Sequence, residues 1–494
     1  LSDDEIANFA VQRPRFPGVD LQPRLIRHYP DGELVAHAVG YVGALSTADL
    51  ERLDAASYAG TSHTGKTGVE HFNEDLLHGD PGFQQVVTNA LGRQVPVETR
   101  DYADSAPESE SPVPGANIYL SLDLDLQRTA SNALEGRRGA VVAIDPRNGE
   151  ILALYSSPSF DPNSFATGMS PSEYNTMQND SDRPLFNRAV RGAYPPGSTI
   201  KPMLSLAALE VGATNLTRRS LCWGWYSLPG STHRYRDWRP EGHGEVDLHD
   251  AIEQSCDVYF YEISRDIGID NMHLYLDQFG LGRKTAIDMI GESEGLNPSR
   301  DWKRKAFRER ADQVWFPGET IIASIGQGYM LATPLQLANA TAALAARGQR
   351  FRPRLVAAFE DPLSGRRTLI APEPLQRVQI ENEFYWENVL LAMQDVMQSE
   401  TGTARASGLG APYQMAGKSG TAQVFTVAQD EEYDEEEIDE RLRDHALFIA
   451  FAPFEDPQIA VSVIVENGSS GSRIAAPIAR AVMDRFLGFA DDEL

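Results

Sequence analysis

Ser198 and Lys201 carry the side chains of a nucleophile and a base, and they lie three residues apart. If a helix begins there, this spacing puts both on one face, with the lysine amine close to the serine hydroxyl. A buried amine beside a second cation can lose its proton near neutral pH and then activate that hydroxyl. The chain has six lysines and only this one Ser-x-x-Lys motif. A helix-start serine beside an ordinary surface lysine is the alternative, since motifs this short also occur by chance.

A second hydroxyl lies in the triplet Ser255-Cys256-Asp257, directly after the amphipathic stretch 248–254. In that position it could relay a proton between a lysine and a departing amine. The Ser-x-Asp pattern alone is weak, because it also occurs at Ser121-Leu122-Asp123. Its place in the chain, after the Ser-x-x-Lys motif, carries more weight than the triplet itself.

A third motif, Lys418-Ser419-Gly420-Thr421, lies on an expected strand. The charge of Lys418 and the hydroxyls of Ser419 and Thr421 suit a substrate carboxylate. Gly420 leaves room for a ligand along the strand edge. The backbone N–H groups of Thr421 and Ser198 could together stabilise an oxyanion.

The elements that must position these motifs alternate between strands and helices. Strands are expected at 116–122, 139–144, 150–156, 414–425, 445–452 and 458–466, and helices at 123–134, 198–211 and 473–487. Asn148-Gly149 predicts a hairpin. The helix after Ser198 is apolar nearly all round, which predicts a central buried position, and Gly212 is a natural stop for it.

Residues 1–112 are expected to form one domain and residues 113–494 another. The acidic, Ser- and Pro-rich stretch 101–115 has the composition of a linker between them. Helices are expected at 46–60 and 69–93. Lys66-Thr67-Gly68 resembles the Lys418 motif but precedes the nucleophile, so we expect a structural role for it. The acidic stretch 430–443 is expected to be an exposed loop.

The composition excludes some classes of partner. The 494 residues carry a net charge of −27, which argues against nucleic acid or an anionic membrane as the main partner. No apolar run reaches the ~18 residues that a spanning helix needs. A chain of this length with 41% hydrophobic residues can bury a large core in two or more domains.

Both cysteines of the chain share one segment with an aspartate and a histidine, in the set Cys222, Asp237, His243 and Cys256. These ligand types suit a tetrahedral zinc ion, and four protein ligands would make the site closed and therefore structural. Cys256 is the middle residue of the Ser255 triplet, so a metal there would brace the loop that carries the serine. A Cys222–Cys256 disulfide and two free buried thiols are the alternatives.

The ordered set Ser-x-x-Lys, Ser-x-Asp and Lys-Ser-Gly resembles that of the penicillin-recognising acyltransferases. The longer stretches RGAYPPGSTIKP, YRDWRPEGHG, IGQGYMLATPLQLA, GKSGTAQVF and DHALFIAFAP are similar to class B penicillin-binding proteins, most of all to the penicillin-binding protein 2 branch. HAVGYVG and GKTGVEHFNEDLLHG resemble that family's membrane-proximal pedestal. The resemblance implies an α/β (α+β) transpeptidase fold, with a five-stranded antiparallel sheet between helical layers and an elongated, partial N-terminal pedestal.

The same resemblance implies a serine-type peptidoglycan D,D-transpeptidase of cell-wall elongation that β-lactams inhibit and that needs no cofactor for catalysis. Ser198 would be the nucleophile, Lys201 its base, and Ser255 with Lys418 a proton relay. Lys418, Ser419 and Thr421 would bind the terminal carboxylate of a stem pentapeptide. A neighbouring stem, with meso-diaminopimelate, would supply the acceptor amine. Some members of the penicillin-binding protein 2 branch also hold structural zinc in the region of Cys222, with Asp at that position.

Partners and location are implied in the same way. The family works with a membrane glycan polymerase of the SEDS family and with a scaffold protein of the rod complex that docks on the pedestal. The chain would be the periplasmic domain of an inner-membrane protein whose single membrane helix is absent from this sequence. No nucleic acid is expected as a partner.

One position departs from the family pattern, and three other functions share the motifs. Many relatives carry Asn at the position of Asp257; an Asn can donate an amide proton, whereas an ionised Asp cannot.

A β-lactamase would need a base that activates water and would not need a pedestal. A D,D-carboxypeptidase would use water as the acceptor. A non-catalytic cell-wall sensor could keep the fold, but the intact Ser198, Lys201, Ser255 and Lys418 argue against it.

Overall fold

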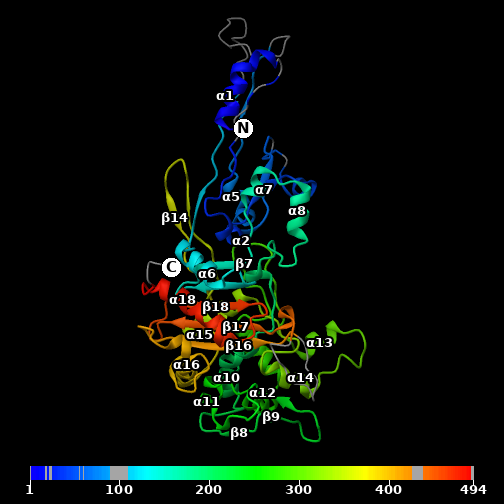
Figure 1. Cartoon of the computed structure of the whole chain (residues 1–494), viewed down its shortest axis with the longest axis vertical. Coiled ribbons are helices and arrows are strands. Elements are labelled where there is room, and N and C mark those ends of the chain that lie inside the picture. Colours follow the sequence, from blue (N-terminus) through cyan, green and yellow to red (C-terminus); the bar gives the residue numbers. More distant parts are fainter. Residues whose placement is uncertain are drawn as a thin grey trace.

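The computed structural model describes residues 2–16, 19, 21, 25–54, 56–58, 60–88, 109–424 and 438–490. Figure 1 shows an elongated molecule: the N-terminal helix α1 (Asp3–Gln12) projects at one end, and a sheet with its helices forms the larger part. The predicted linker 101–115 and acidic loop 430–443 lie partly outside the described residues. None of the described helices is long and apolar enough to cross a membrane.

A five-stranded antiparallel sheet lies at the centre of the larger part, in the order β16-β17-β18-β6-β7. These strands are Ala416–Ala422, His445–Ala452, Ile459–Val465, Gly139–Ile144 and Ile151–Ser157. β18 and β6 are buried along their whole length, as continuous runs of Val, Ile and Ala predict for strands covered on both faces. The expected fold class and the five-stranded sheet are confirmed. β16 is an edge strand of this sheet: no strand of the described residues pairs with its outer side.

Helices cover both faces of the sheet (Figure 1). α15 (Pro334–Ala345) and α16 (Glu383–Gln398) lie on one side, and α6 (Leu124–Leu134) and α18 (Ala476–Phe486) lie on the other. Beyond the first layer, α10 (Lys201–Glu210) is buried against α12 (Asp257–Gln278) and α16, as its apolar sequence predicts. Gly212, with φ +72°, follows its C-terminus.

The N-terminal part consists of short elements, and the two helices predicted there were wrong in extent. Instead of helices over 46–60 and 69–93, the structure has α3 (Thr47–Arg52), α4 (Gly68–Phe72) and α5 (Glu74–Leu77). Gly79 has φ +70°, outside the right-handed helical region, so no helix continues through it. Lys66 forms an ion pair with Asp49 in this part, which agrees with a structural role.

The remaining elements are short. The helices are α2 (Ala36–Val39), α7 (Asn163–Thr167), α8 (Pro171–Gln178), α9 (Arg188–Arg191), α11 (Leu248–Glu253), α13 (Arg300–Ala306), α14 (Pro317–Ala323) and α17 (Arg405–Gly408). The strands are β1 (Val42–Ala44), β2 (His63–Gly65), β3 (Phe83–Gln84), β4 (Ser109–Glu110), β5 (Asn117–Leu120), β8 (Ser220–Cys222), β9 (Trp225–Tyr226), β10 (Tyr235–Arg236), β11 (Gly244–Val246), β12 (Arg350–Phe351), β13 (Val356–Glu360), β14 (Arg367–Leu369) and β15 (Pro374–Leu375).

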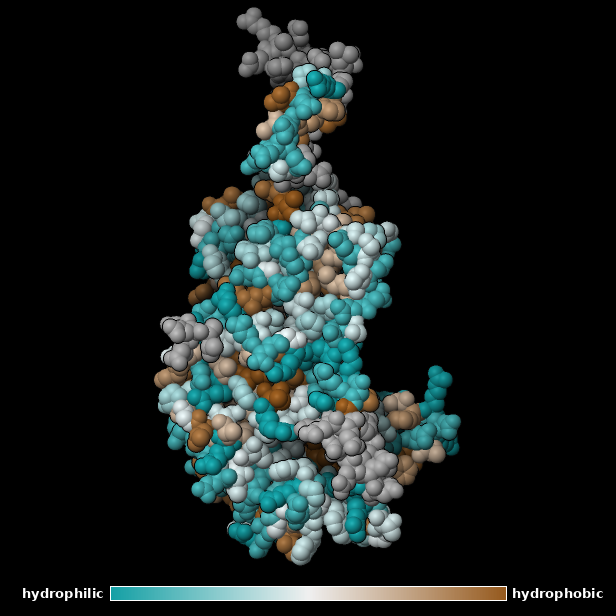
Figure 2. All heavy atoms as spheres, in the orientation of Figure 1, coloured by the Kyte–Doolittle hydropathy of each residue, from teal (hydrophilic) through white to brown (hydrophobic). Residues whose placement is uncertain are grey.

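Buried hydrogen bonds join the N-terminal part to the sheet-containing part. The Asn187 side chain donates to the carbonyl oxygen of His37 at 2.9 Å, and the Gln127 side chain donates to that of Leu34 at 2.9 Å. On the face in Figure 2, apolar residues form separate patches among hydrophilic ones, in keeping with the net charge of −27. The two parts therefore pack directly on each other.

Candidate active site

Ser198 lies at the start of the buried helix α10, in a 3-10 turn that the sequence did not predict. The turn covers Gly197–Ile200, and the α-helix continues from Lys201. Gly197 has φ +56°, and a Cβ there would lie 2.5 Å from the carbonyl oxygen of Thr421. Only glycine fits this close approach. The turn thus places Ser198 against the outer edge strand β16.

Lys201 is fully buried, and its amine is bound by the Ser255 loop. Its Nζ donates to the carbonyl oxygen of Ser255 at 2.8 Å and to Asp257 Oδ1 at 2.7 Å, and it lies 3.4 Å from Ser255 Oγ. Ser198 and Lys201 are both described, and no hydrogen bond joins their side chains in the structure. The Lys201 amine binds the Asp257 carboxylate and the Ser255 carbonyl oxygen instead, and its role toward Ser198 stays a prediction.

Ser255 connects the two lysines of the site. Lys418, on β16, donates from Nζ to Ser255 Oγ at 2.8 Å and to the carbonyl oxygen of Ser419 at 2.9 Å. Ser255 lies between α11 and α12 with φ +59°, a left-handed conformation that is uncommon for a residue other than glycine. One hydroxyl oxygen therefore contacts both amines.

The three ionisable groups of the site are all withdrawn from water. Lys201 and Lys418 have no exposed surface, and Asp257 is nearly as buried. Burial raises the pKa of Asp257, although the charge of Lys201 opposes this. Burial, together with the nearby charge of Lys201, lowers the pKa of Lys418 well below its usual range. Burial therefore favours the neutral forms of Asp257 and Lys418.

The packing of the protein itself requires glycine at position 420. A Cβ on Gly420 would lie 2.8 Å from Thr199 Cγ2 and 3.0 Å from the carbonyl oxygen of Pro196. On the other side, a Cβ on Gly471 would lie 2.3 Å from the carbonyl oxygen of Gly420. β16 is thus held between the turn Gly197–Ile200, which carries Ser198, and the segment at Gly471. Thr421 is exposed at the edge of the strand.

Two residues beside the site were not predicted from the sequence. The Gln327 side chain donates from Nε2 to the carbonyl oxygen of Thr421 at 2.9 Å. The hydroxyl of Thr403 lies 3.1 Å from that of Ser419. The glycines on either side of Gln327 were a usable signal, because they mark a turn that can approach another backbone closely; Thr403 carried no such signal.

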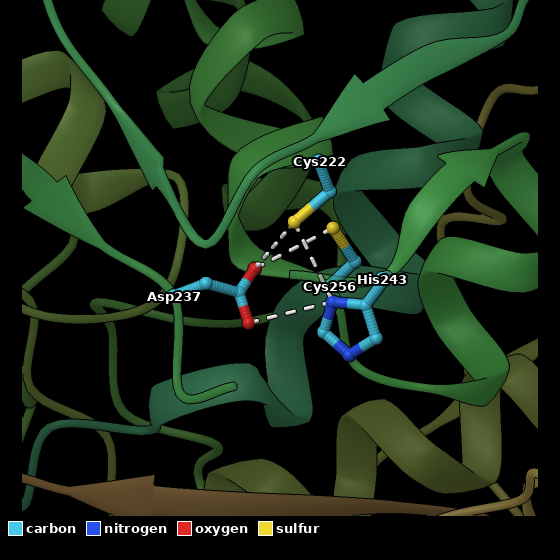
Figure 3. Close-up of side chains that lie close together, drawn as sticks. All are labelled: Cys222, Asp237, His243 and Cys256. Carbon is cyan, nitrogen blue, oxygen red and sulfur yellow. Dashed lines mark hydrogen bonds and ion pairs between the residues drawn. The ribbon is translucent and has the colours of Figure 1, made fainter. Parts of the chain in front are cut away.

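The four residues of the expected metal site come together next to Ser255, since Cys256 is one of them (Figure 3). One ligand atom from each lies within 4.8 Å of the others. Cys222 Sγ and Cys256 Sγ are each 3.5 Å from Asp237 Oδ2, and His243 Nδ1 is 3.6 Å from Cys222 Sγ. The two cysteines are buried and are not joined by a disulfide.

This cluster contacts the backbone that follows Ser255. Asp237 Oδ2 accepts hydrogen bonds from the N–H groups of Asp257 at 2.8 Å and Val258 at 3.1 Å, at the start of α12. A carboxylate at a helix N-terminus satisfies otherwise unpaired donors. The hydrogen bond from Cys256 lowers the pKa of Cys222 to about 5, so this sulfur favours the thiolate form that binds metals.

Comparisons with known proteins agree with this site and fold. Residues 139–484 match the family described as the penicillin binding protein transpeptidase domain, and residues 1–120 match the penicillin-binding protein dimerisation domain. The peptidoglycan D,D-transpeptidase MrdA of Acinetobacter baumannii is 44% identical over 496 residues, which cover 99% of this chain and 70% of that protein.

Two solved structures are similar over most of the chain. PBP2 of Pseudomonas aeruginosa, in complex with WCK 5153, is 44% identical with a TM-score of 0.79, over 96% of this chain and 94% of that one. PBP2 of Helicobacter pylori, in complex with MreC, is 29% identical with a TM-score of 0.82, over 99% of this chain and 84% of that one. Together with the shared motifs, these matches show that the chain belongs to the class B penicillin-binding proteins, among the peptidoglycan D,D-transpeptidases of the MrdA group.

Proposed function

We propose that this chain cross-links peptidoglycan stem peptides during cell-wall elongation, with Ser198 as the nucleophile of a D,D-transpeptidase. The observation that carries the residue roles is the position of Ser255 Oγ, 2.8 Å from Lys418 Nζ and 3.4 Å from Lys201 Nζ. Because Lys201 follows Ser198 in the same helical turn, this chain of groups gives a proton a path from nucleophile to leaving group.

In the first step, Ser198 Oγ attacks the carbonyl carbon of the penultimate D-Ala of a stem pentapeptide, and its proton passes to Lys201. Lys201 must be neutral to accept it, and Asp257, whose pKa is raised by burial, can hold the proton that Lys201 gives up. The N–H groups of Ser198 and Thr421 stabilise the oxyanion. The C–N bond then breaks as the proton moves from Lys201 through Ser255 and Lys418 to the nitrogen of the departing D-Ala.

In the second step, an amine of a neighbouring stem, that of meso-diaminopimelate in our proposal, attacks the ester carbonyl carbon. The amine gives a proton to the relay, and Ser198 Oγ leaves with a proton from Lys201. Lys418, Ser419 and Thr421 bind the terminal carboxylate of the donor stem. A carboxylate beside Lys418 favours its charged form, so this amine gains charge as the substrate arrives. β-Lactams acylate Ser198 by the same route.

Intact-mass spectrometry with peptide mapping tests the nucleophile. After incubation with benzylpenicillin, we expect one persistent adduct on Ser198 and none on Ser198→Ala. Rapid loss of the adduct would indicate a β-lactamase, and absence of an adduct on folded protein would favour the non-catalytic sensor. Turnover of a pentapeptide with and without an acceptor amine then separates cross-linking from carboxypeptidase action.

We also propose that the four-residue cluster holds a structural zinc ion. Zn–S bonds of about 2.3 Å and Zn–O or Zn–N bonds of about 2.0–2.2 Å predict separations of roughly 3.3–3.8 Å between the ligand atoms of a tetrahedron. The 3.5 Å and 3.6 Å contacts within the cluster agree with these values. The ion would supply no chemistry to the reaction; it would fix Asp237 and Cys256, and through them the loop that carries Ser255.

Metal analysis of the purified protein tests this site. We expect about one zinc per chain, and none in Cys222→Ser. Chelation should lower the melting temperature of the wild-type protein and leave that of Cys222→Ser unchanged. Protein refolded with zinc that binds none would contradict the proposal, as would a Cys222–Cys256 disulfide found by mass mapping.

The domain division, the location and the partners are also proposals for this chain. We propose that residues 1–112 form the pedestal and residues 113–494 the transpeptidase domain of a periplasmic, inner-membrane protein. The Helicobacter pylori relative was solved with MreC, which supports a rod-complex scaffold protein as a partner of the pedestal. The second proposed partner is a SEDS-family glycan polymerase. Loss of scaffold binding on deletion of residues 1–112, with acylation kept, would support both the division and the docking site.

A further inference from the structure

The outer edge of β16 offers one backbone carbonyl to a ligand at the position of Thr421. β16 is an edge strand, and Thr421 is exposed. In an antiparallel pair, a residue that accepts from the partner's N–H also donates its own N–H to the partner's C=O. Under the proposed function, the acyl D-Ala carbonyl accepts from Thr421 N–H. The N–H of that same D-Ala therefore needs the carbonyl oxygen of Thr421.

Gln327 already occupies this carbonyl oxygen. Its Nε2 donates to it at 2.9 Å. A backbone carbonyl oxygen has two lone pairs, and Gln327 takes one of them, so an arriving substrate amide meets a donor that already binds this oxygen. Gln327 is half-buried, so water can replace this partner, at a cost of about one net hydrogen bond.

A rigid turn holds Gln327 in this place. Gly326 and Gly328 have φ +72° and +74°, and the carbonyl oxygen of Gly326 accepts from Gly197 N–H at 3.0 Å. A Cβ on Gly326 would lie 2.2 Å from the carbonyl oxygen of Gly197. The turn that carries Gln327 is therefore fixed to the residue before Ser198, while its side chain reaches across to Thr421.

We propose that Gln327 is a specificity-determining residue that competes with the amide N–H of the donor substrate for the carbonyl oxygen of Thr421. This inference rests on the proposed function. A ligand that brings its own N–H replaces Gln327, and a ligand without one leaves the Gln327 hydrogen bond in place. Gln327 thereby imposes a cost on amide-bearing ligands alone.

The test compares second-order acylation rate constants for two β-lactams on the same protein preparations. Benzylpenicillin has an amide N–H on the carbon next to its reactive carbonyl, and a carbapenem with a hydroxyethyl group there has none. In Gln327→Ala and Gln327→Met, we expect the ratio of benzylpenicillin rate to carbapenem rate to rise about two- to tenfold, the worth of one net hydrogen bond. Because each ratio is taken within one preparation, the fraction of folded protein cancels.

Gln313→Ala is the matched control, since the Gln313 side chain donates to a backbone carbonyl, that of Phe307 at 2.9 Å, away from β16. Its ratio should equal that of the wild type. An unchanged or lowered ratio in both Gln327 variants overturns the role of Gln327 and leaves the proposed function intact. Failure of both β-lactams to acylate the folded wild type overturns the proposed function, and with it this inference.

Discussion

Ser255 is the residue on which the chemistry of the site most depends, because its one hydroxyl oxygen contacts both lysines. We expect Ser255→Ala to lower the acylation rate constant by about 10²–10⁴-fold, the usual contribution of a positioned proton relay. The measurement is the rate of adduct formation with a labelled penicillin.

Ser264→Ala is a matched control for this prediction. Ser264 is another buried serine, on α12, and its hydroxyl donates only to the carbonyl oxygen of Tyr261 at 2.7 Å. Both variants should have similar melting temperatures, and only Ser255→Ala should lose acylation. Equal acylation rates in the two variants would contradict the relay.

Residue types and spacing predicted Ser198, Lys201, Ser255 and Lys418 as site residues, and the structure brings the side chains of Lys201, Ser255 and Lys418 together. They were not enough to predict the partner of each amine. The sequence left the contact of Asp257 open, and in the structure this side chain binds Lys201 at 2.7 Å. That contact depends on the left-handed conformation of Ser255, which has no signal in the sequence since most residues with this φ are glycine.

At the scale of elements, the site depends on turns that approach each other closely. Gly326→Ala would place a Cβ 2.2 Å from the carbonyl oxygen of Gly197, so the nucleophile turn must shift. We expect a loss of acylation of at least about tenfold, because a misplacement of about 1 Å has large effects on rate.

Gly365→Ala separates this displacement from backbone strain. Gly365 also has a left-handed φ, +67°, but a Cβ there would meet nothing within 4 Å. Both variants should lose about 1–2 kcal/mol of stability from the left-handed conformation, and Gly365→Ala should keep wild-type acylation. Full activity of Gly326→Ala would show that the two turns are not coupled.

An ion pair ties α9 to the end of β18. Arg188 Nε donates to Glu466 Oε1 at 2.9 Å, and the Tyr194 hydroxyl donates to the same oxygen at 2.7 Å. Burial alone would raise the pKa of Glu466, but Arg188 and Tyr194 hold it below its ordinary value. The carboxylate therefore adds stability above pH 4.5, and this contribution is lost as the pH falls through the lower pKa of the folded state.

We expect Glu466→Gln to lower the free energy of unfolding by about 3–5 kcal/mol at pH 7, because it leaves Arg188 buried without its charge partner. The difference from the wild type should shrink as the pH falls from 4.5 to 3. Denaturant titrations at three pH values measure this. A difference that stays constant with pH, or an equal effect of Glu360→Gln, which removes a half-buried surface carboxylate paired with Arg367, would contradict the assignment.

Buried elements were the best predicted from the sequence. The limits of β6 and β17 agree with the expected 139–144 and 445–452, because continuous apolar runs mark strands covered on both faces. The N-terminal helices were overestimated, since short helices depend on tertiary contacts more than on their own propensity. The 3-10 turn at Gly197–Ile200 was missed because packing against β16 decides it.

At the scale of the whole molecule, His37 makes the junction between the two parts sensitive to pH. It lies on α2, its ring packs edge-on against Phe160, and its carbonyl accepts from Asn187. Burial lowers the pKa of His37 to about 4, and the charge of Arg188 acts in the same direction. The unfolded chain therefore binds a proton below pH 6.5 that the folded protein does not, so stability falls as the pH is lowered.

We expect this group to cost about 2 kcal/mol of stability between pH 7 and pH 5. His37→Gln, which cannot charge, should lose this part of the pH dependence, whereas the exposed His233→Gln should keep it. Melting temperatures from pH 5 to pH 7.5 measure the effect. Parallel curves for the wild type and His37→Gln would contradict the prediction.

The close packing of Gly197, Gly326, Gly420 and Gly471 has a consequence for synthesis and folding. These segments are spread over more than half of the chain, so the nucleophile turn gains its shape only after contacts of high sequence separation have formed. A nascent chain that ends before Gly471 lacks the segment that holds β16 from behind. A penicillin should therefore label only chains that are completely synthesised and folded. Labelling with a fluorescent penicillin would then measure the fraction of this protein that has folded completely.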